Sequence, residues 1–160
     1  MSTLARIRFA PSRPGDAAAM SALAEAAYRH SVPRIGKPPA PMTADYGAIA
    51  AGPHVTLAWR RDELVGMLVL ELRGDVAQIE NVAVSPALQG SGLGSELLRR
   101  AEADARAAGC VVARLYTNER MTENLAFYPR RGYVETHRRE DAGFRRVFFE
   151  KSLTPAAEKE

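Results

Sequence analysis

A glycine-rich turn between an apolar segment and an amphipathic segment is the feature that most restricts the fold of this chain. The apolar segment covers residues 76–84, and the turn is Gln89-Gly90-Ser91-Gly92-Leu93-Gly94. After the turn, apolar residues recur on one helical stripe: Leu93, Leu97, Leu98, Ala101 and Ala105. Residues 110–117 then form another apolar run after Gly109. A strand, a helix and a second strand in this order form one parallel crossover unit. The turn is therefore expected at the carboxyl end of the first strand of that unit.

The rest of the chain adds antiparallel strands and more helices. Alternating patterns and short polar turns predict strands at residues 6–10, 54–60, 64–73, 76–84, 133–138 and 144–152. Helical spacing predicts helices from Asp16 to about His30, from Thr43 to about Ala51, and from Met121 to Arg131. The proline-rich residues 31–42 are expected to form a loop. The prediction is an α/β fold: a mixed, mostly antiparallel twisted sheet of about seven strands flanked by four helices, in the order β-α-α-β-β-β-α-β-α-β-β.

The length and composition indicate one folded domain. The chain has 160 residues, of which 46% are hydrophobic and 26% charged, an ordinary globular balance. We expect a single domain over residues 1–153 and a polar tail over residues 154–160. The single cysteine excludes an intramolecular disulfide and favours a reducing compartment, so a cytoplasmic location is expected. The amino end does not resemble a signal peptide, and residues 64–70 are too short to span a membrane, so we predict a soluble protein without membrane contact.

The distribution of histidine and arginine argues against a metal site and against nucleic-acid binding. Three scattered histidines and the one cysteine (His30, His54, His137 and Cys110) form no close ligand pair, so no metal is predicted. Cys110 begins an apolar strand and is expected to be buried. The net charge of +3 favours anionic partners. The arginine pairs are short and lie among acidic residues: Arg99-Arg100, Arg130-Arg131, Arg138-Arg139 and Arg145-Arg146. They are interpreted as solvated faces rather than a nucleic-acid surface.

The glycine turn itself predicts a site for an anion, most simply a pyrophosphate. Glycines at alternate positions, Gly90, Gly92 and Gly94, let the backbone approach a ligand closely. The helix that follows directs its free N–H groups and the positive end of its dipole to the same place. The turn ends in Gly94-Ser95, so it lacks the Gly-Lys-Ser/Thr of a nucleotide triphosphatase loop, and its GxGxG spacing differs from the GxGxxG of dinucleotide-binding domains.

At this point the chain resembles the GCN5-related N-acetyltransferase (GNAT) superfamily, whose acetyl-CoA loop reads Gln/Arg-x-x-Gly-x-Gly/Ala. Residues Gln89 to Gly94 match that loop. The similarity includes the preceding strand, Val82-Ala83-Val84, and a late tyrosine element, Tyr128-Pro129-Arg130-Arg131-Gly132-Tyr133. The element order agrees over about residues 5–152. The combination of these motifs in family order is far more specific than any one of them.

The resemblance implies acetyl-CoA as cosubstrate and assigns the residues that bind it. The pyrophosphate would lie on the amides of the loop, and the pantetheine arm would pair with the strand that carries Val82 and Val84. The backbone amide of Val82 would polarise the thioester carbonyl. The implied cofactor-binding residues are Val82, Ala83, Val84, Gln89, Gly90, Ser91, Gly92, Leu93, Gly94, Ser95, Asn124 and Tyr128.

The resemblance also assigns catalytic roles to Glu80 and Tyr128. Glu80 lies two positions before Val82 and so on the same face of the strand, where it could accept the proton of the amine directly or through a water. Tyr128 stands where the family carries the tyrosine that protonates the leaving thiolate. The family often has an asparagine seven residues before this tyrosine, but that position is Met121. Asn124, one helical turn before Tyr128, and Asn118 are the two alternatives.

The activity predicted in this way is direct transfer of an acetyl group from acetyl-CoA to a primary amine of a small molecule or peptide, through a ternary complex. The family usually binds the acceptor between its first helical segment with the following loop and its last hairpin, here residues 28–46 and 137–144. The resemblance also allows a homodimer. The main alternative is a non-catalytic acyl-CoA-binding module. A basic nucleic-acid-binding domain is a less favoured alternative.

Overall fold

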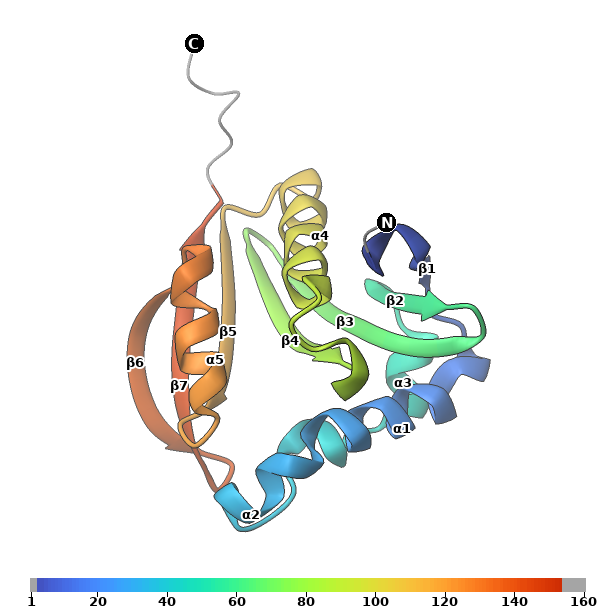
Figure 1. The fold of residues 1–160 in the computed structure, drawn as a ribbon. Helices are drawn as coiled ribbons and strands as arrows, with labels where there is room; N and C mark the ends of the chain where they lie inside the picture. The colour runs from blue at the N-terminus through green and yellow to red at the C-terminus, as the bar shows by residue number, and fades with distance from the viewer. Residues whose placement is uncertain (1–2, 154–160) are drawn as a thin grey trace. The chain divides into compact units, whose positions relative to one another are not determined.

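The computed structural model describes residues 3–153 and shows a mixed α/β fold (Figure 1). Its helices and strands follow in the order β1 (Arg8–Pro11), α1 (Ala17–Tyr28), α2 (Val32–Ile35), α3 (Tyr46–Ala51), β2 (Val55–Arg60), β3 (Glu63–Arg73), β4 (Val76–Val84), α4 (Leu93–Ala107), β5 (Val112–Asn118), α5 (Thr122–Phe127), β6 (Val134–Asp141) and β7 (Phe144–Ser152). The seven strands are hydrogen-bonded in the order β1-β2-β3-β4-β5-β7-β6. Strand β4 is parallel to β5, whereas β1 with β2, β2 with β3, β5 with β7 and β6 with β7 are antiparallel. The predicted fold class is confirmed.

The chain divides into two compact units, each assembled from separate stretches of sequence. The first comprises Met1–Leu70 with Asn81–Arg99, and the second comprises Glu71–Glu80 with Arg100–Glu160. Strands β3 and β4 and helix α4 each contribute residues to both units. The expectation of a single domain over residues 1–153 stays a prediction, and the predicted polar tail, residues 154–160, lies outside the described residues.

The core of the first unit lies between α1 and α3 and one face of β2, β3 and β4. In Figure 1, α1 and α3 lie together on the same side of β2 and β3. The buried residues are Met20, Leu23, Ala24, Ala27, Tyr46, Ala50, Val55, Leu57, Leu64, Met67, Val69 and Ala83. On the opposite face, a Cβ placed on Gly66 would lie 3.0 Å from Leu93 Cδ2 and 3.2 Å from Leu97 Cδ1. Gly66 therefore lets α4 approach β3 closely, which explains why the apolar stripe of α4 is fully buried.

The proline-rich segment is more regular than predicted. Residues 31–42 contain α2 and a 3₁₀ turn at Ala40–Met42, and another 3₁₀ turn, Arg29–Ser31, precedes α2. Both α2 and the Ala40–Met42 turn carry a proline at their first or second position, where a missing N–H costs no helical hydrogen bond. The expectation of a plain loop was wrong for this reason.

Two other helix limits differ from the prediction. Helix α3 begins after Asp45 rather than Thr43, because Asp45 Oδ1 accepts a hydrogen bond from the Ala48 N–H at 3.1 Å. Helix α5 ends at Phe127, and the residues up to Arg131 continue as a 3₁₀ turn that starts at Pro129. Gly132 follows in the left-handed region, with φ of +92°.

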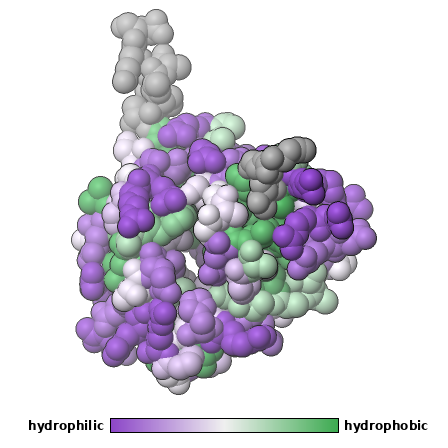
Figure 2. Space-filling view, viewed as in Figure 1, coloured by the Kyte–Doolittle hydropathy of each residue, from purple (hydrophilic) through white to green (hydrophobic). Residues whose placement is uncertain are grey.

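The second unit is built on β5, β7 and β6. One face of this sheet buries Ala113, Leu115, Val147 and Phe149. Glu102, near the end of α4, is buried on the same unit and accepts hydrogen bonds from the Tyr133 hydroxyl and from Lys151 Nζ, both at 2.9 Å. This buried carboxylate is therefore both neutralised and hydrogen-bonded. Hydrophilic side chains predominate over β6 in Figure 2, in agreement with its exposure.

Candidate active site

The glycine turn opens α4 in a conformation that only glycine adopts easily. Gly90 and Gly92 have φ of +82° and +95°, in the left-handed region. The turn is held by hydrogen bonds from the Ser91 N–H to the Leu88 carbonyl at 3.1 Å and from the Leu93 N–H to Ser91 Oγ at 3.3 Å. No atom lies within 4 Å of a Cβ built on Gly90, so the turn leaves open space above its backbone.

Several backbone donors of this turn have no acceptor in the part of the protein that the structure describes. Among residues 3–153, the N–H groups of Gly90, Gly92 and Gly94 have no hydrogen-bond partner. Helix α4 is 15 residues long and begins at Leu93, so its dipole adds positive potential at the same point. Unpaired amides at the start of a long helix form a site for an anion. Phosphate binding by these loop residues stays a prediction.

Strand β4 carries the predicted site residues on alternate faces. Glu80, Val82 and Val84 are at least partly exposed, whereas Asn81 and Ala83 are buried. Ala83 belongs to the core of the first unit, so only its backbone is available to a ligand. The parallel ladder pairs Val76, Ala77 and Gln78 with β5 and ends there, although both strands continue. Within the second unit, Ile79 and Glu80 thus take no part in the β5 ladder.

A buried polar network, which the sequence analysis missed, lies beside this strand. Asn81 is 8% exposed. Its Oδ1 accepts a hydrogen bond from the Tyr28 hydroxyl at 2.6 Å, and its Nδ2 donates to the Tyr46 hydroxyl at 3.1 Å. The Tyr46 hydroxyl donates in turn to the Pro41 carbonyl at 2.5 Å, and burial raises the pKa of Tyr46 to about 12. The Tyr28 hydroxyl is also 3.2 Å from the carbonyl oxygen of Val82. The network thus connects the proline-rich segment to the strand that carries Val82.

Replacing Asn81 by leucine should lower the free energy of unfolding by about 1–3 kcal/mol, because the side chain is similar in size but the two tyrosine hydroxyls lose a partner. Urea denaturation measures the change. The matched control is Gln78→Leu on the opposite face of β4, where the side chain is half-buried and a change within about 0.5 kcal/mol is expected. Equal stability of the Asn81 variant and the wild-type protein would contradict the role of this network.

The electrostatic surroundings of Glu80 favour a base. Although the side chain is exposed, partial burial of its carboxyl raises the pKa of Glu80, and the negative charge of Glu71 raises it further. The positive charges of Arg73 and Arg146 act in the opposite direction. A carboxylate with a raised pKa is a stronger base than one in free solution.

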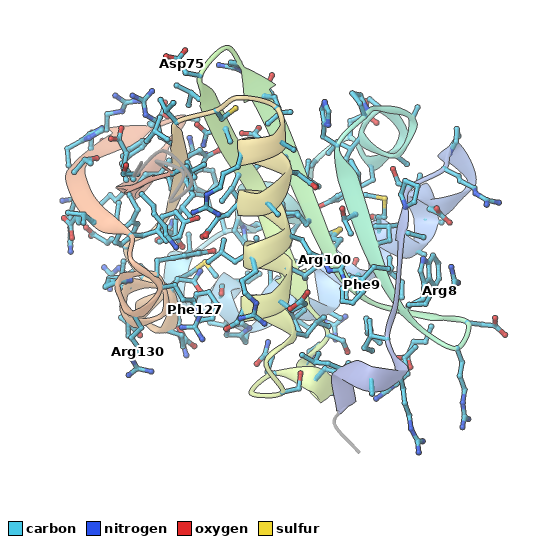
Figure 3. The ribbon with its side chains drawn as sticks, turned by 90° about the horizontal axis from the view of Figure 1, so that it is seen from above. Arg8, Phe9, Asp75, Arg100, Phe127 and Arg130 are labelled. Carbon is cyan, nitrogen blue, oxygen red and sulfur yellow. The ribbon has the colours of Figure 1, made fainter. Side chains whose placement is uncertain are left out.

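The surroundings of Tyr128 favour an acid. Tyr128 is 8% exposed and packs edge-on to Tyr133 and tilted to Phe149, both with ring centroids 5.9 Å away. Burial raises its pKa to about 12, opposed by the charge of Arg131, so it keeps its proton at neutral pH. Its hydroxyl has no hydrogen-bond partner among residues 3–153, where every fully buried side-chain polar atom has one. The hydroxyl oxygen therefore reaches solvent and is free to donate. Figure 3 labels Phe127, the last residue of α5, and Arg130 in the 3₁₀ turn that follows it.

Glu80 and Tyr128 belong to the same unit but lie on different faces of its sheet. Tyr128 packs on the sheet face that carries Phe149. Glu80 responds to the charge of Arg146, which alternates with Val147 and so lies on the other face of β7. An acid and a base on opposite faces can protonate a leaving group on one side while deprotonating a nucleophile on the other.

The two asparagine alternatives are already hydrogen-bonded within the protein. Asn124 is half-buried, and its Nδ2 donates to the Thr117 hydroxyl at 2.9 Å. Asn118 ends β5, and its Oδ1 accepts from the Arg120 N–H at 2.9 Å. Met121 is buried at the start of α5. Either asparagine retains a carbonyl or amide group for a ligand, so the choice between them stays a prediction.

Other interpretations of the sequence can also be compared with the structure. Cys110 is buried, as predicted, with its thiol 3.6 Å from the Gly74 carbonyl. Arg146, which was expected on a solvated face, is only 8% exposed, so that expectation was wrong. Among residues 3–153, no three potential ligand side chains lie together where they could hold a metal ion. In the same range, no helix is both long enough and apolar enough to cross a membrane.

Comparison with solved structures shows the class of fold. The PaiA N-acetyltransferase from Thermoplasma acidophilum in complex with coenzyme A is 16% identical, with a TM-score of 0.75, over 91% of this chain and 98% of that chain. The ribosomal-protein-S18-alanine N-acetyltransferase from Escherichia coli is 17% identical, with a TM-score of 0.76, over 96% of this chain and 98% of that chain. Both share the acetyltransferase fold.

The sequence itself shows the family. Residues 18–133 match the Acetyltransferase (GNAT) family, so the chain belongs to this family. A curated relative, the aminoalkylphosphonate N-acetyltransferase of Salmonella typhimurium, is 36% identical over 90 residues. That alignment covers 52% of this chain and 58% of the relative, so it spans little more than half of either protein.

Proposed function

We propose that this protein is an acetyl-CoA-dependent N-acetyltransferase that transfers the acetyl group directly to a primary amine of a small molecule or peptide. Membership of the GNAT family supports the activity, and the name of the Salmonella relative supports a small-molecule acceptor. The observation that carries the proposal is the set of unpaired amides at Gly90, Gly92 and Gly94, directly after the strand that bears Glu80. The single cysteine supports action in a reducing, cytoplasmic setting.

The residues present suit acetyl-CoA. The unpaired amides and the amino end of α4 offer donors and positive potential to a pyrophosphate. Strand β4 continues past the end of its ladder with β5, so main-chain groups beyond Gln78 can pair with an extended amide-containing arm. The complex of the PaiA N-acetyltransferase with coenzyme A is consistent with this assignment.

The chemistry is the formation of a C–N bond and the cleavage of the C–S bond of a thioester, which acetyl-CoA supplies in activated form. The backbone N–H of Val82 stabilises the negative charge that develops on the thioester carbonyl oxygen. Glu80 accepts the proton that the attacking amine loses, directly or through a water. Tyr128 gives its proton to the departing sulfur. Because Glu80 and Tyr128 both have the surroundings that these roles need, an enzyme is favoured over a non-catalytic acyl-CoA-binding module.

Calorimetric titration with acetyl-CoA, with CoA as a second ligand and ATP as a negative control, tests this function. The wild-type protein should bind acetyl-CoA and CoA, and Gly92→Val should weaken binding about tenfold or more, because valine is strained at a φ of +95° and its side chain covers the amides.

Gly109→Val is the matched control for this titration. Gly109 has a φ of +88° at the other end of α4, and no atom lies within 4 Å of a Cβ built on it, so the substitution causes the same strain away from the turn. It should lower stability and leave acetyl-CoA affinity unchanged. Absence of acetyl-CoA binding by the wild-type protein, or an equal loss of affinity in the two variants, would refute the assignment.

A further inference from the structure

The exposed face of the second unit combines aromatic rings with positive charges. On β5 and β7, the Tyr116 and Phe148 rings lie 5.6 Å apart. The His137 ring stacks on Phe148 at 4.4 Å, and the Arg139 guanidinium lies 4.5 Å from the centre of the same ring. The Arg146 guanidinium lies 4.2 Å from the centre of the Tyr116 ring. We call these five residues the aromatic–arginine face.

Arg146 is the unusual member of this face. Its side chain is 9% exposed, although arginine is rarely buried unless it is paired. The Asp141 carboxylate accepts a hydrogen bond from Arg146 Nη1 at 2.9 Å, and the same carboxylate lies 3.9 Å from Arg139. Arg139 and Arg146 are direct cross-strand partners, an arrangement in which like charges destabilise a sheet. One carboxylate thus serves two guanidinium groups.

Arg146 and Glu80 lie on the same face of the second unit. Gln78 pairs with Arg114, so Glu80, two residues further along β4 and just past the end of the ladder, points to the same face as Tyr116. The Arg146 guanidinium lies over Tyr116, and its charge acts on the Glu80 carboxyl. Strand β5 lies between β4 and β7, so Glu80 and Arg146 flank the Tyr116 side chain on one face of the sheet. This arrangement suits a short molecule.

We infer that the acceptor carries an anionic group a few bonds from its primary amine, and that Arg146 binds this anion while the amine reaches Glu80. The inference rests on the proposed acetyltransferase function and specifies its substrate class: short amino acids with a terminal amine, or aminoalkylphosphonates. A guanidinium binds carboxylate and phosphonate oxygens through two parallel N–H groups. The guanidinium stacks on the Tyr116 ring, and its hydrogen bond to Asp141 fixes its orientation.

Two amines that differ only in the anion test this inference. Aminoethylphosphonate and ethylamine have the same carbon chain and amine, and thiol release measures kcat/KM for each at one fixed pH on the plateau of the wild-type pH profile. With the wild-type protein, kcat/KM should be about tenfold or more higher for aminoethylphosphonate. Arg146→Gln should remove about ten- to hundredfold of kcat/KM for that substrate, mainly through KM, and should abolish the preference for the phosphonate over ethylamine.

Arg145→Gln is the matched control, because it removes the same charge from the residue of β7 that directly precedes Arg146. The Arg145 side chain is 73% exposed and pairs with Glu119 at 2.9 Å, away from the aromatic–arginine face. The Arg145→Gln variant should retain the preference for aminoethylphosphonate over ethylamine. The comparison of the two amines with the wild-type protein does not depend on how the variants fold.

The outcomes separate this inference from the proposed function. Equal kcat/KM for the two amines, including no turnover of either, would overturn the inference, and so would equal losses in Arg146→Gln and Arg145→Gln. If the same protein still binds acetyl-CoA in the calorimeter, the proposed function stands and only the acceptor class is wrong. If it binds no acetyl-CoA, both proposals fail.

Discussion

Glu80→Gln is expected to lower kcat by about a hundred- to ten-thousandfold, the range for loss of a general base. Glutamine has nearly the same shape as glutamate but cannot accept the proton that the attacking amine loses. The Kd for acetyl-CoA should stay within about twofold, because the backbone of the glycine turn and of β4 provides the donors for that ligand. Thiol release measures kcat, and calorimetry measures the affinity. If the variant turns over at the wild-type rate, Glu80 is not the base.

The neighbours of Glu80 give a sharper test through the pH profile. Activity should fall as the pH drops through the pKa of Glu80, which lies above its usual value. Glu71→Gln removes the negative charge that raises this pKa, so the acidic limb should move to lower pH. Arg73→Gln removes a charge that lowers it, so the limb should move to higher pH. Both variants should reach nearly the wild-type rate on the plateau. Shifts of the same sign would contradict the assignment.

Local signals determined the strands that could be predicted well. The limits of β4 and β7 agree with the prediction because residues that interrupt strands lie beside each of them. For β4, Gly74-Asp75 precedes the strand and Ser85-Pro86 follows it. The glycine turn was equally accessible, because all its donors come from one continuous stretch of chain. The helical turns of the proline-rich segment were missed because proline was counted as a breaker. At the first positions of a short helix it is compatible with helix formation.

The side chains that complete the site depend on contacts that the sequence does not show. Arg145 and Arg146 are adjacent and chemically identical, yet one side chain is 73% exposed and the other 9%. Alternation along a strand predicts that they face opposite sides. Only the pairing of β7 with β5 and β6 determines which of the two is covered by neighbouring side chains. The same holds for Asn81, whose partners Tyr28 and Tyr46 are 53 and 35 residues away.

Tyr128→Phe is expected to lower kcat by about a hundredfold or more, because phenylalanine cannot protonate the departing thiolate. The Kd for acetyl-CoA should change little, since the ring that fills the space against Phe149 is retained. With a pKa of about 12, Tyr128 stays protonated through neutral and mildly alkaline pH, so it should cause no alkaline loss of wild-type activity there. Thiol-release assays across this pH range, together with calorimetry, measure these effects.

Tyr133→Phe is the control that separates chemistry from packing. The ring centroids of Tyr133 and Tyr128 are 5.9 Å apart, and both substitutions remove a phenol hydroxyl. In the wild-type protein, however, the Tyr133 hydroxyl donates a hydrogen bond to the buried Glu102 at 2.9 Å. Its loss leaves Glu102 with Lys151 and should lower the free energy of unfolding by about 1–3 kcal/mol, with kcat within a few-fold of wild type. If Tyr128→Phe instead lost stability and kept its rate, the Tyr128 hydroxyl would be structural, and the proton for the thiolate would come from another donor.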